Sequence, residues 1–209
     1  MRRRPILAAA LATAVAFGPW ASAAEPQVTD PANDANFLNN QGYSQVPAPH
    51  SNPTPVGSQG YADVLSVLWE KVGRDVKVTA TFTAPPAPPS PTRLVYRMLG
   101  KVGESCTFVG VVWYSTKSSD PSIPKSAVRD SCTGETVLTE IAEPKIEGNK
   151  MIWTAPLAKF PKAAIAAGQL TDLRVEIREL QDYGMEVDGS YGGANGLIEV
   201  ATSTNSFKL

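Results

Sequence analysis

Apolar and polar side chains alternate along several short segments, which is the pattern of a strand with one buried face. The clearest alternation runs from Leu173 to Ile177, where Arg174 and Glu176 separate the apolar residues. A second runs from residue 76 to 82, and a Gly-Arg-Asp turn at 73–75 joins it to an apolar segment at 63–70. These two segments predict an antiparallel hairpin with one face toward solvent.

The same pattern, interrupted by turn residues, continues to the end of the chain. Further strands are expected at 94–98, 107–114, 136–141 and 197–201, and a hairpin at 145–155 with its turn at 147–149. Residues 115–129 are predicted to form a polar loop, and 162–167 a short helix that ends at Gly168. About eight strands with turns at short intervals predict an all-β fold, an antiparallel β-sandwich of the jelly-roll kind.

The first 24 residues have the three parts of a secretory signal peptide. Three arginines at 2–4 precede an apolar run at 6–17, and small residues at 21–24 follow a Gly-Pro break. The apolar run is shorter than the roughly 20 residues that span a bilayer. We therefore expect a secreted, extracellular protein whose mature chain has no membrane span.

The mature chain divides into an irregular part and a folded part. Residues 25–60 are rich in Asn, Gly and Pro and show no apolar alternation, so they are expected to be an irregular N-terminal segment. Residues 61–209 are expected to form the sandwich. About 185 residues after the signal peptide suit a single domain.

The charge balance argues against a nucleic-acid partner. The chain has 19 Lys and Arg and 20 Asp and Glu, and removal of the three signal-peptide arginines leaves 16 against 20. The remaining basic residues are scattered among acids instead of forming a basic patch. The same scatter argues against docking to anionic lipid.

Cys106 and Cys132 are the two cysteines of the chain. An even number of cysteines outside the cytoplasm predicts a disulfide, here one between these two. The two alternatives are a catalytic thiol and a zinc site. Both are weakly supported, because His50 is the single histidine and no CxxC spacing is present.

Several short motifs resemble extracellular DOMON-type sandwiches, which include the family-nine carbohydrate-binding modules. The motifs are Asp30-Pro31 with Asp34, Asp63-Val64, Gly148-Asn149 leading to Trp153–Leu157, and Gly168-x-Leu170 leading to Leu173–Glu176. The family pattern has Gly where this chain has Asn33. The resemblance implies a sandwich that binds sugars or accompanies a domain that does, with a structural calcium ion near the N-terminal acidic motif.

The residues themselves also allow a calcium site. Asp30, Asp34 and Asn36 place three oxygen ligands within one short loop, and Asp63 begins a strand that the loop could cross. Hard oxygen donors at this density suit Ca²⁺. The alternative is an ordinary Asx-turn, in which Asp30 and Asn33 bond to nearby backbone.

Aromatic residues are the candidates for stacking on a sugar ring. Trp69, Trp113 and Trp153 lie in strand-like runs, where large aromatic side chains more often fill the core than bind a ligand. Tyr183 and Tyr191 lie in polar loops around a Gly-rich segment and carry no motif.

Sequence motifs of the common enzyme classes are missing. The chain has no GxSxG, HExxH, Walker or GxGxxG motif, although a pair of carboxylates for glycoside hydrolysis remains open. We therefore expect a non-catalytic secreted protein that binds a polysaccharide or a cell-envelope glycan. The alternatives are a structural or protein-interaction protein of the envelope, and a glycoside hydrolase or other hydrolase.

Overall fold

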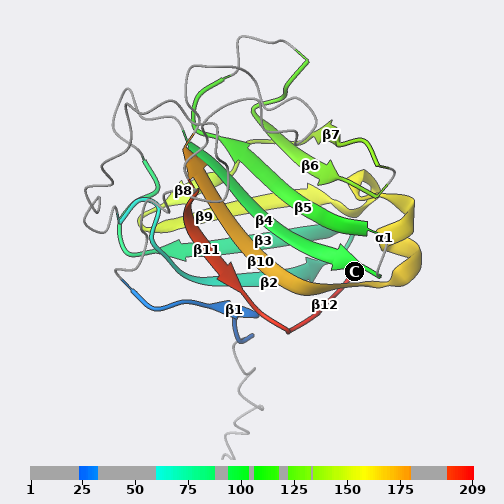
Figure 1. Ribbon diagram of the computed structural model, residues 1–209, viewed down its shortest axis with the longest axis horizontal. Coiled ribbons are helices and arrows are strands. Elements are labelled where there is room, and N and C mark those ends of the chain that lie inside the picture. The colour runs from blue at the N-terminus through cyan, green and yellow to red at the C-terminus, as the bar shows by residue number, and fades with distance from the viewer. Residues whose placement is uncertain are drawn as a thin grey trace, which may run out of the picture.

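Two antiparallel sheets pack face to face (Figure 1). The computed structural model describes residues 24–32, 60–87, 94–103, 106–117, 122–132, 134–179 and 197–209. Within these residues the first sheet has the strand order β1 (Val28–Thr29), β2 (Val64–Val72), β3 (Asp75–Phe82), β9 (Lys150–Pro156), β8 (Lys145–Glu147). The second has the order β11 (Leu197–Thr202), β10 (Gln169–Glu179), β4 (Leu94–Val102), β5 (Cys106–Tyr114), β6 (Ser126–Asp130), β7 (Val137–Glu140). The strand β12 (Phe207–Lys208) also pairs with β10.

The chain passes from one sheet to the other three times. Strands β1 to β3 lie in the first sheet, β4 to β7 in the second, β8 and β9 in the first again, and β10 to β12 in the second. Each strand pair in the described part is antiparallel. The prediction of an all-β antiparallel sandwich is confirmed.

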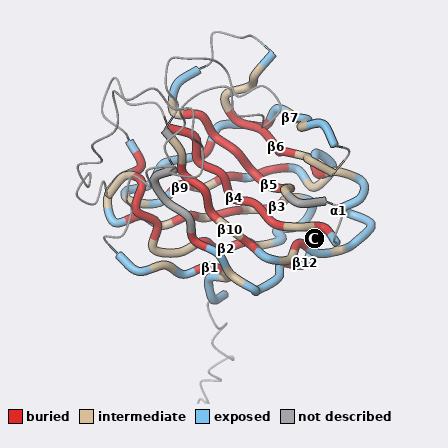
Figure 2. Tube along the Cα trace, viewed as in Figure 1, coloured by how far each residue is buried: buried red, intermediate tan, exposed pale blue. Residues whose placement is uncertain are grey.

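The core lies between the sheets and is built from every second residue of the central strands. Figure 2 shows the buried positions concentrated in the middle of these strands. In β3 the predicted apolar face is fully buried, and in β10 four apolar residues, Leu170, Leu173, Val175 and Ile177, face it from the other sheet. Burial of apolar area at about 25 cal/mol per Å² makes this alternation the main determinant of the strand register.

The predicted helix is present as α1 (Lys162–Ala167), after a short 3-10 turn at Leu157–Lys159. Gly168 ends it with a φ of 70°, and its N–H donates to the carbonyl oxygen of Ala164. A residue with a side chain rarely adopts this left-handed conformation, so glycine defines the helix end. The predicted hairpin around Gly148 is also present, as β8 and β9.

The polar-loop prediction for 115–129 is wrong over its last four residues, which belong to β6. The segment Ser126-Ala127-Val128-Arg129-Asp130 is mostly buried between β5 and β7. Its small and charged residues show no clear apolar alternation. The segment forms a strand because it pairs with β5 on one side and β7 on the other. The two-residue strands β1 and β12 were also not predicted, and β10 extends beyond the predicted 173–177 at both ends.

Some predictions concern residues outside the described part. They are the signal peptide, most of the irregular segment at 25–60, and the Gly-rich loop that precedes β11. Among the described residues, no helix has the length and apolar character needed to cross a membrane.

Candidate functional site

The four predicted calcium ligands are only partly within the described residues. Asp30 follows β1, Asp63 precedes β2, and Asp34 and Asn36 lie outside the described part. Asp63 is fully buried, and its Oδ2 accepts a hydrogen bond from the Thr83 hydroxyl at 2.8 Å. No cluster of three or more possible metal ligands occurs among the described residues. The calcium site therefore stays a prediction.

The two cysteines lie at the same end of neighbouring strands. Cys106 begins β5, Cys132 follows β6 by two residues, and the register pairs Val109 with Asp130 in between. The described part contains no free cysteine. The side chain of Cys106 is outside the described part, so the disulfide also stays a prediction.

The three strand tryptophans fill the sandwich core. Trp69, Trp113 and Trp153 all belong to the core cluster, with at most 9% of each residue exposed. Trp113 also meets polar groups, because its Nε1 donates to Glu143 at 3.4 Å and the Lys125 Nζ lies 5.8 Å from the centroid of its ring. These rings fill the core as expected and offer no open platform for a sugar. Tyr183 and Tyr191 lie outside the described part.

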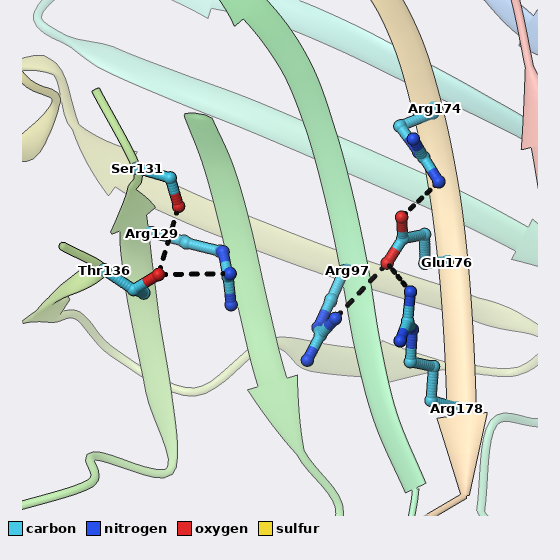
Figure 3. A network of polar contacts seen from close by, with 7 residues as sticks. All are labelled: Arg97, Arg129, Ser131, Thr136, Arg174, Glu176 and Arg178. Atoms are coloured by element: carbon cyan, nitrogen blue, oxygen red, sulfur yellow. Dashed lines mark hydrogen bonds and ion pairs between the residues drawn. The ribbon is translucent and has the colours of Figure 1, made fainter. Parts of the chain in front are cut away.

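Sequence analysis missed the main polar feature of the described structure, a group of charged side chains on the outer face of the second sheet (Figure 3). We call it the arginine network. It consists of Glu176 and the four arginines Arg97, Arg129, Arg174 and Arg178.

Strand geometry places these side chains on one face. Arg97 alternates along β4 with Tyr96 and Met98, which belong to the core cluster between the sheets. Arg97 therefore points away from that core, because successive residues of a strand face opposite sides. The register pairs Arg97 directly with Glu176 of β10, which also has core residues on both sides.

Three guanidinium groups converge on the carboxylate of Glu176. The Glu176 Oε2 lies 3.3 Å from Nη1 of Arg97 and 3.1 Å from Nη2 of Arg178. Arg174 contacts the other oxygen, Oε1. The side chains of Arg97 and Glu176 are 3% and 4% exposed, whereas that of Arg174 is 27% exposed. The network is therefore buried at Arg97 and Glu176 and more accessible at Arg174.

The charges of the network alter the pKa values of Glu176 and Tyr114. Burial by itself would raise the pKa of Glu176, but the guanidinium groups of Arg178, Arg97 and Arg174 outweigh it and lower that pKa. Burial raises the pKa of the nearby Tyr114, and the charges of Arg97 and Arg129 partly offset this rise. Glu176 is therefore ionised and Tyr114 neutral at neutral pH.

Arg129 extends the network to β6. Its Nη2 donates to the Thr136 hydroxyl at 3.2 Å, and that oxygen lies 3.3 Å from the Ser131 hydroxyl. Gly110 of β5 pairs with Arg129 on one side and with Leu99 on the other. A Cβ at Gly110 would lie 2.0 Å from the Met98 carbonyl oxygen, so the close approach of β4 and β5 requires glycine here.

Apolar side chains surround the guanidinium groups. A small cluster on this face contains Val95, Leu99, Val112 and Tyr114, with Phe108 and Ile123 packed against it. The guanidinium carbon of Arg174 lies 4.9 Å from the centroid of the Phe108 ring. Apolar neighbours lower the local dielectric constant and strengthen each charge interaction. The stacking on Phe108 also fixes the plane of the Arg174 guanidinium.

One sequence signal could have revealed this face. Arg97 is the one charged residue in the otherwise apolar segment 94–99, whereas the charges of β10 look like an ordinary solvated face. A single arginine within an apolar strand requires a partner on an adjacent strand.

Comparison with known proteins adds no family to this description. No protein-family model matches the chain, and no curated protein or solved structure is significantly similar to it.

Proposed function

We propose that this protein is a secreted, non-catalytic β-sandwich that binds a polysaccharide or cell-envelope glycan on the outer face of its second sheet. The observation that carries the proposal is the arginine network on β4, β6 and β10, set among apolar and aromatic side chains. A ligand site commonly combines an apolar surface with a few fixed polar groups.

The chemistry of this face suits a sugar polymer. Guanidinium groups and hydroxyls donate hydrogen bonds to sugar oxygens, and half-buried Phe108 offers an apolar surface for a ring face. The centre of this face is buried, and its more accessible part lies at Arg174, whose side chain is 27% exposed, beside half-buried Phe108. Export of the protein would bring it to such polymers.

The carboxylate of Glu176 is poorly suited to act as the acid in glycoside hydrolysis. Glycoside hydrolysis needs one carboxylic acid with a raised pKa beside a second carboxylate. Among the described carboxylates, those of Glu143, Glu147 and Glu176 have clearly altered pKa values, and all three are lowered by neighbouring cations. Glu176 in particular is ionised at neutral pH and so a poor proton donor.

The calcium ion belongs to this proposal as a structural element. Asp30, Asp34, Asn36 and Asp63 would hold it by carboxylate and amide oxygens, the ligands that Ca²⁺ prefers. It would fix the N-terminal segment beside β2. Burial of the Asp63 carboxylate at the start of β2 is compatible with this role.

A glycan array probed with the mature chain, residues 25–209, tests the proposed function. We expect binding to a defined group of polysaccharides and no release of reducing sugar from them. An absence of binding across plant, microbial and animal glycans would contradict the proposal, and turnover would make the protein an enzyme.

A second candidate function, a structural or protein-interaction role in the envelope, is favoured by β7. This strand ends the order of the second sheet, and Val137 is 48% exposed on it. An edge strand can pair with a strand of another protein. The strand β8, at an edge of the first sheet, instead carries an exposed ion pair between Lys145 and Glu147, which disfavours such pairing. A negative glycan array together with a partner cross-linked at β7 would favour this candidate.

A further inference from the structure

Two segments that are far apart in the sequence meet at one end of the sandwich. Asp75, the first residue of β3, pairs with Pro156, the last residue of β9, so the β2–β3 turn and the segment after β9 lie at the same end of the first sheet. The Leu157 N–H donates to the Arg74 carbonyl oxygen at 2.9 Å and joins the two segments. The helix α1, which follows, contacts β10 and the strand β4 at the end of the sandwich where β4 ends (Figure 1).

These two segments carry four exposed basic residues, and we call this part of the molecule the basic end. The residues are Lys71 and Arg74 from the turn, and Lys159 and Lys162 from the segment after β9. None of the ion pairs between described residues involves these four side chains. Of the described acids nearby, Glu70 is paired with Lys77 and Asp172 with Lys101, which leaves Asp75 to offset one of the four charges. The basic end therefore has a positive excess, although the whole chain has a formal charge of −1.

Two large apolar side chains are exposed at the same end. Val72, the last residue of β2, is 55% exposed, and Ile165 of α1 is 41% exposed. The exposed Ile146, by contrast, lies between Lys145 and Glu147, whose charges are paired with each other. Exposed apolar side chains beside unpaired cations are typical of surfaces that bind the interface of an anionic bilayer.

The kind of cation also favours a bilayer over an ordered acidic polymer. Three of the four basic residues are lysines, whose compact charge attracts anionic headgroups without a fixed geometry, whereas the planar fork of arginine suits a defined partner. We propose that the basic end docks onto the surface of an anionic lipid bilayer, with its cations against the headgroups and Val72 and Ile165 within the headgroup region. The basic scatter along the sequence argued against such docking, but the fold gathers these residues. This inference goes beyond the proposed glycan binding and uses residues other than the arginine network.

Co-sedimentation of the mature chain with phosphatidylcholine vesicles, with and without phosphatidylglycerol, tests the proposal. We expect binding only to the vesicles that contain phosphatidylglycerol, and weaker binding as salt screens the exposed charges. The double variant Lys71→Gln with Lys159→Gln should lower the partition coefficient at least about tenfold, since each basic residue near an anionic surface contributes about fivefold.

A second double variant, Lys117→Gln with Lys150→Gln, is the matched control. It also removes two exposed lysines, but Lys117 follows β5 and Lys150 begins β9, so both lie at the opposite end of the sandwich. Its binding should equal that of the unaltered protein. Val72→Ser should weaken binding several-fold, because less apolar surface enters the interface, and Ile146→Ser should not. Thermal melting verifies that each variant folds, as expected for substitutions at exposed positions.

The outcomes separate this inference from the proposed function, because no glycan takes part in the experiment. Equal binding to both kinds of vesicle, or equal losses in the two double variants, would overturn the inference. Unchanged binding of Val72→Ser would overturn the contact of this side chain with the headgroup region. Binding to soluble polyglutamate but not to vesicles would assign the basic end to an acidic polymer and overturn the docking to lipid.

Discussion

Glu176 of β10 lies directly opposite Arg97 of β4, and both side chains are almost completely buried on the outer face of the second sheet. Transfer of either charge from water would be costly without the other. Arg174 and Arg178 flank Glu176 on its own strand and contact the same carboxylate, whereas the contact with Arg97 joins β10 to β4.

Replacement of Glu176 by Gln should destabilise the protein strongly. The change keeps the shape of the side chain but leaves buried Arg97 without the carboxylate charge it pairs with, which typically costs about 3 kcal/mol or more. Urea unfolding would measure this. Glu70→Gln, which breaks the exposed ion pair with Lys77, should cost less than about 1 kcal/mol. Similar losses for the two variants would show that the network does not stabilise the sheet.

Acid should weaken the fold through the same residue. The pKa of Glu176 is lower in the folded protein than its usual value of 4.5, so the unfolded chain binds its proton first as the pH falls. The stabilisation is complete above about pH 4.5 and is lost as the pH falls toward the folded pKa. Unfolding free energies between pH 7 and pH 3 should therefore decrease less steeply in Glu176→Gln than in the unaltered protein. Parallel curves would be the contrary result.

A disulfide between Cys106 and Cys132 should be found in the secreted protein. Mass spectrometry without reductant should give a mass two hydrogens below that of the reduced chain. Reduction should lower the free energy of unfolding by roughly 3 kcal/mol, because the loop it closes gains freedom in the unfolded state. Two free thiols in the secreted protein would refute the prediction.

Calcium should raise the melting temperature if Asp30, Asp34, Asn36 and Asp63 bind one ion. Binding to the folded state alone stabilises it by RT ln(1 + [L]/Kd), so the effect should grow with calcium and vanish with chelator. Asp34→Ala should abolish the response and leave the sandwich folded. A melting temperature indifferent to millimolar calcium would leave these residues as turn formers.

The sandwich could be predicted because its core strands alternate cleanly. The four apolar residues of β3 and the alternating Leu173, Val175 and Ile177 of β10 all point inward, so local pattern and global packing agree. The helix at 162–167 was also predictable, because Gly168 marks its end. The strand β6 was not, since Ser126 and Arg129 are buried only through their neighbours on β5 and β7.

The candidate site was not predictable for a related reason. Arg97 and Glu176 are 79 residues apart in the chain, and only the pairing of β4 with β10 brings them together. The sequence shows the charges of β10 as a polar face but not that this face is buried. Pattern alone also cannot show which of two sheet faces carries a ligand.

The most direct test of the account is hydrogen exchange of the mature chain with and without a polysaccharide that it binds on the glycan array. Ligand bound to the outer face of the second sheet should slow exchange in peptides from β4 and β10, residues 94–102 and 169–179. Peptides from β3, residues 75–82 of the first sheet, should exchange at the same rate in both samples. Slowed exchange confined to the first sheet would contradict the placement of the site.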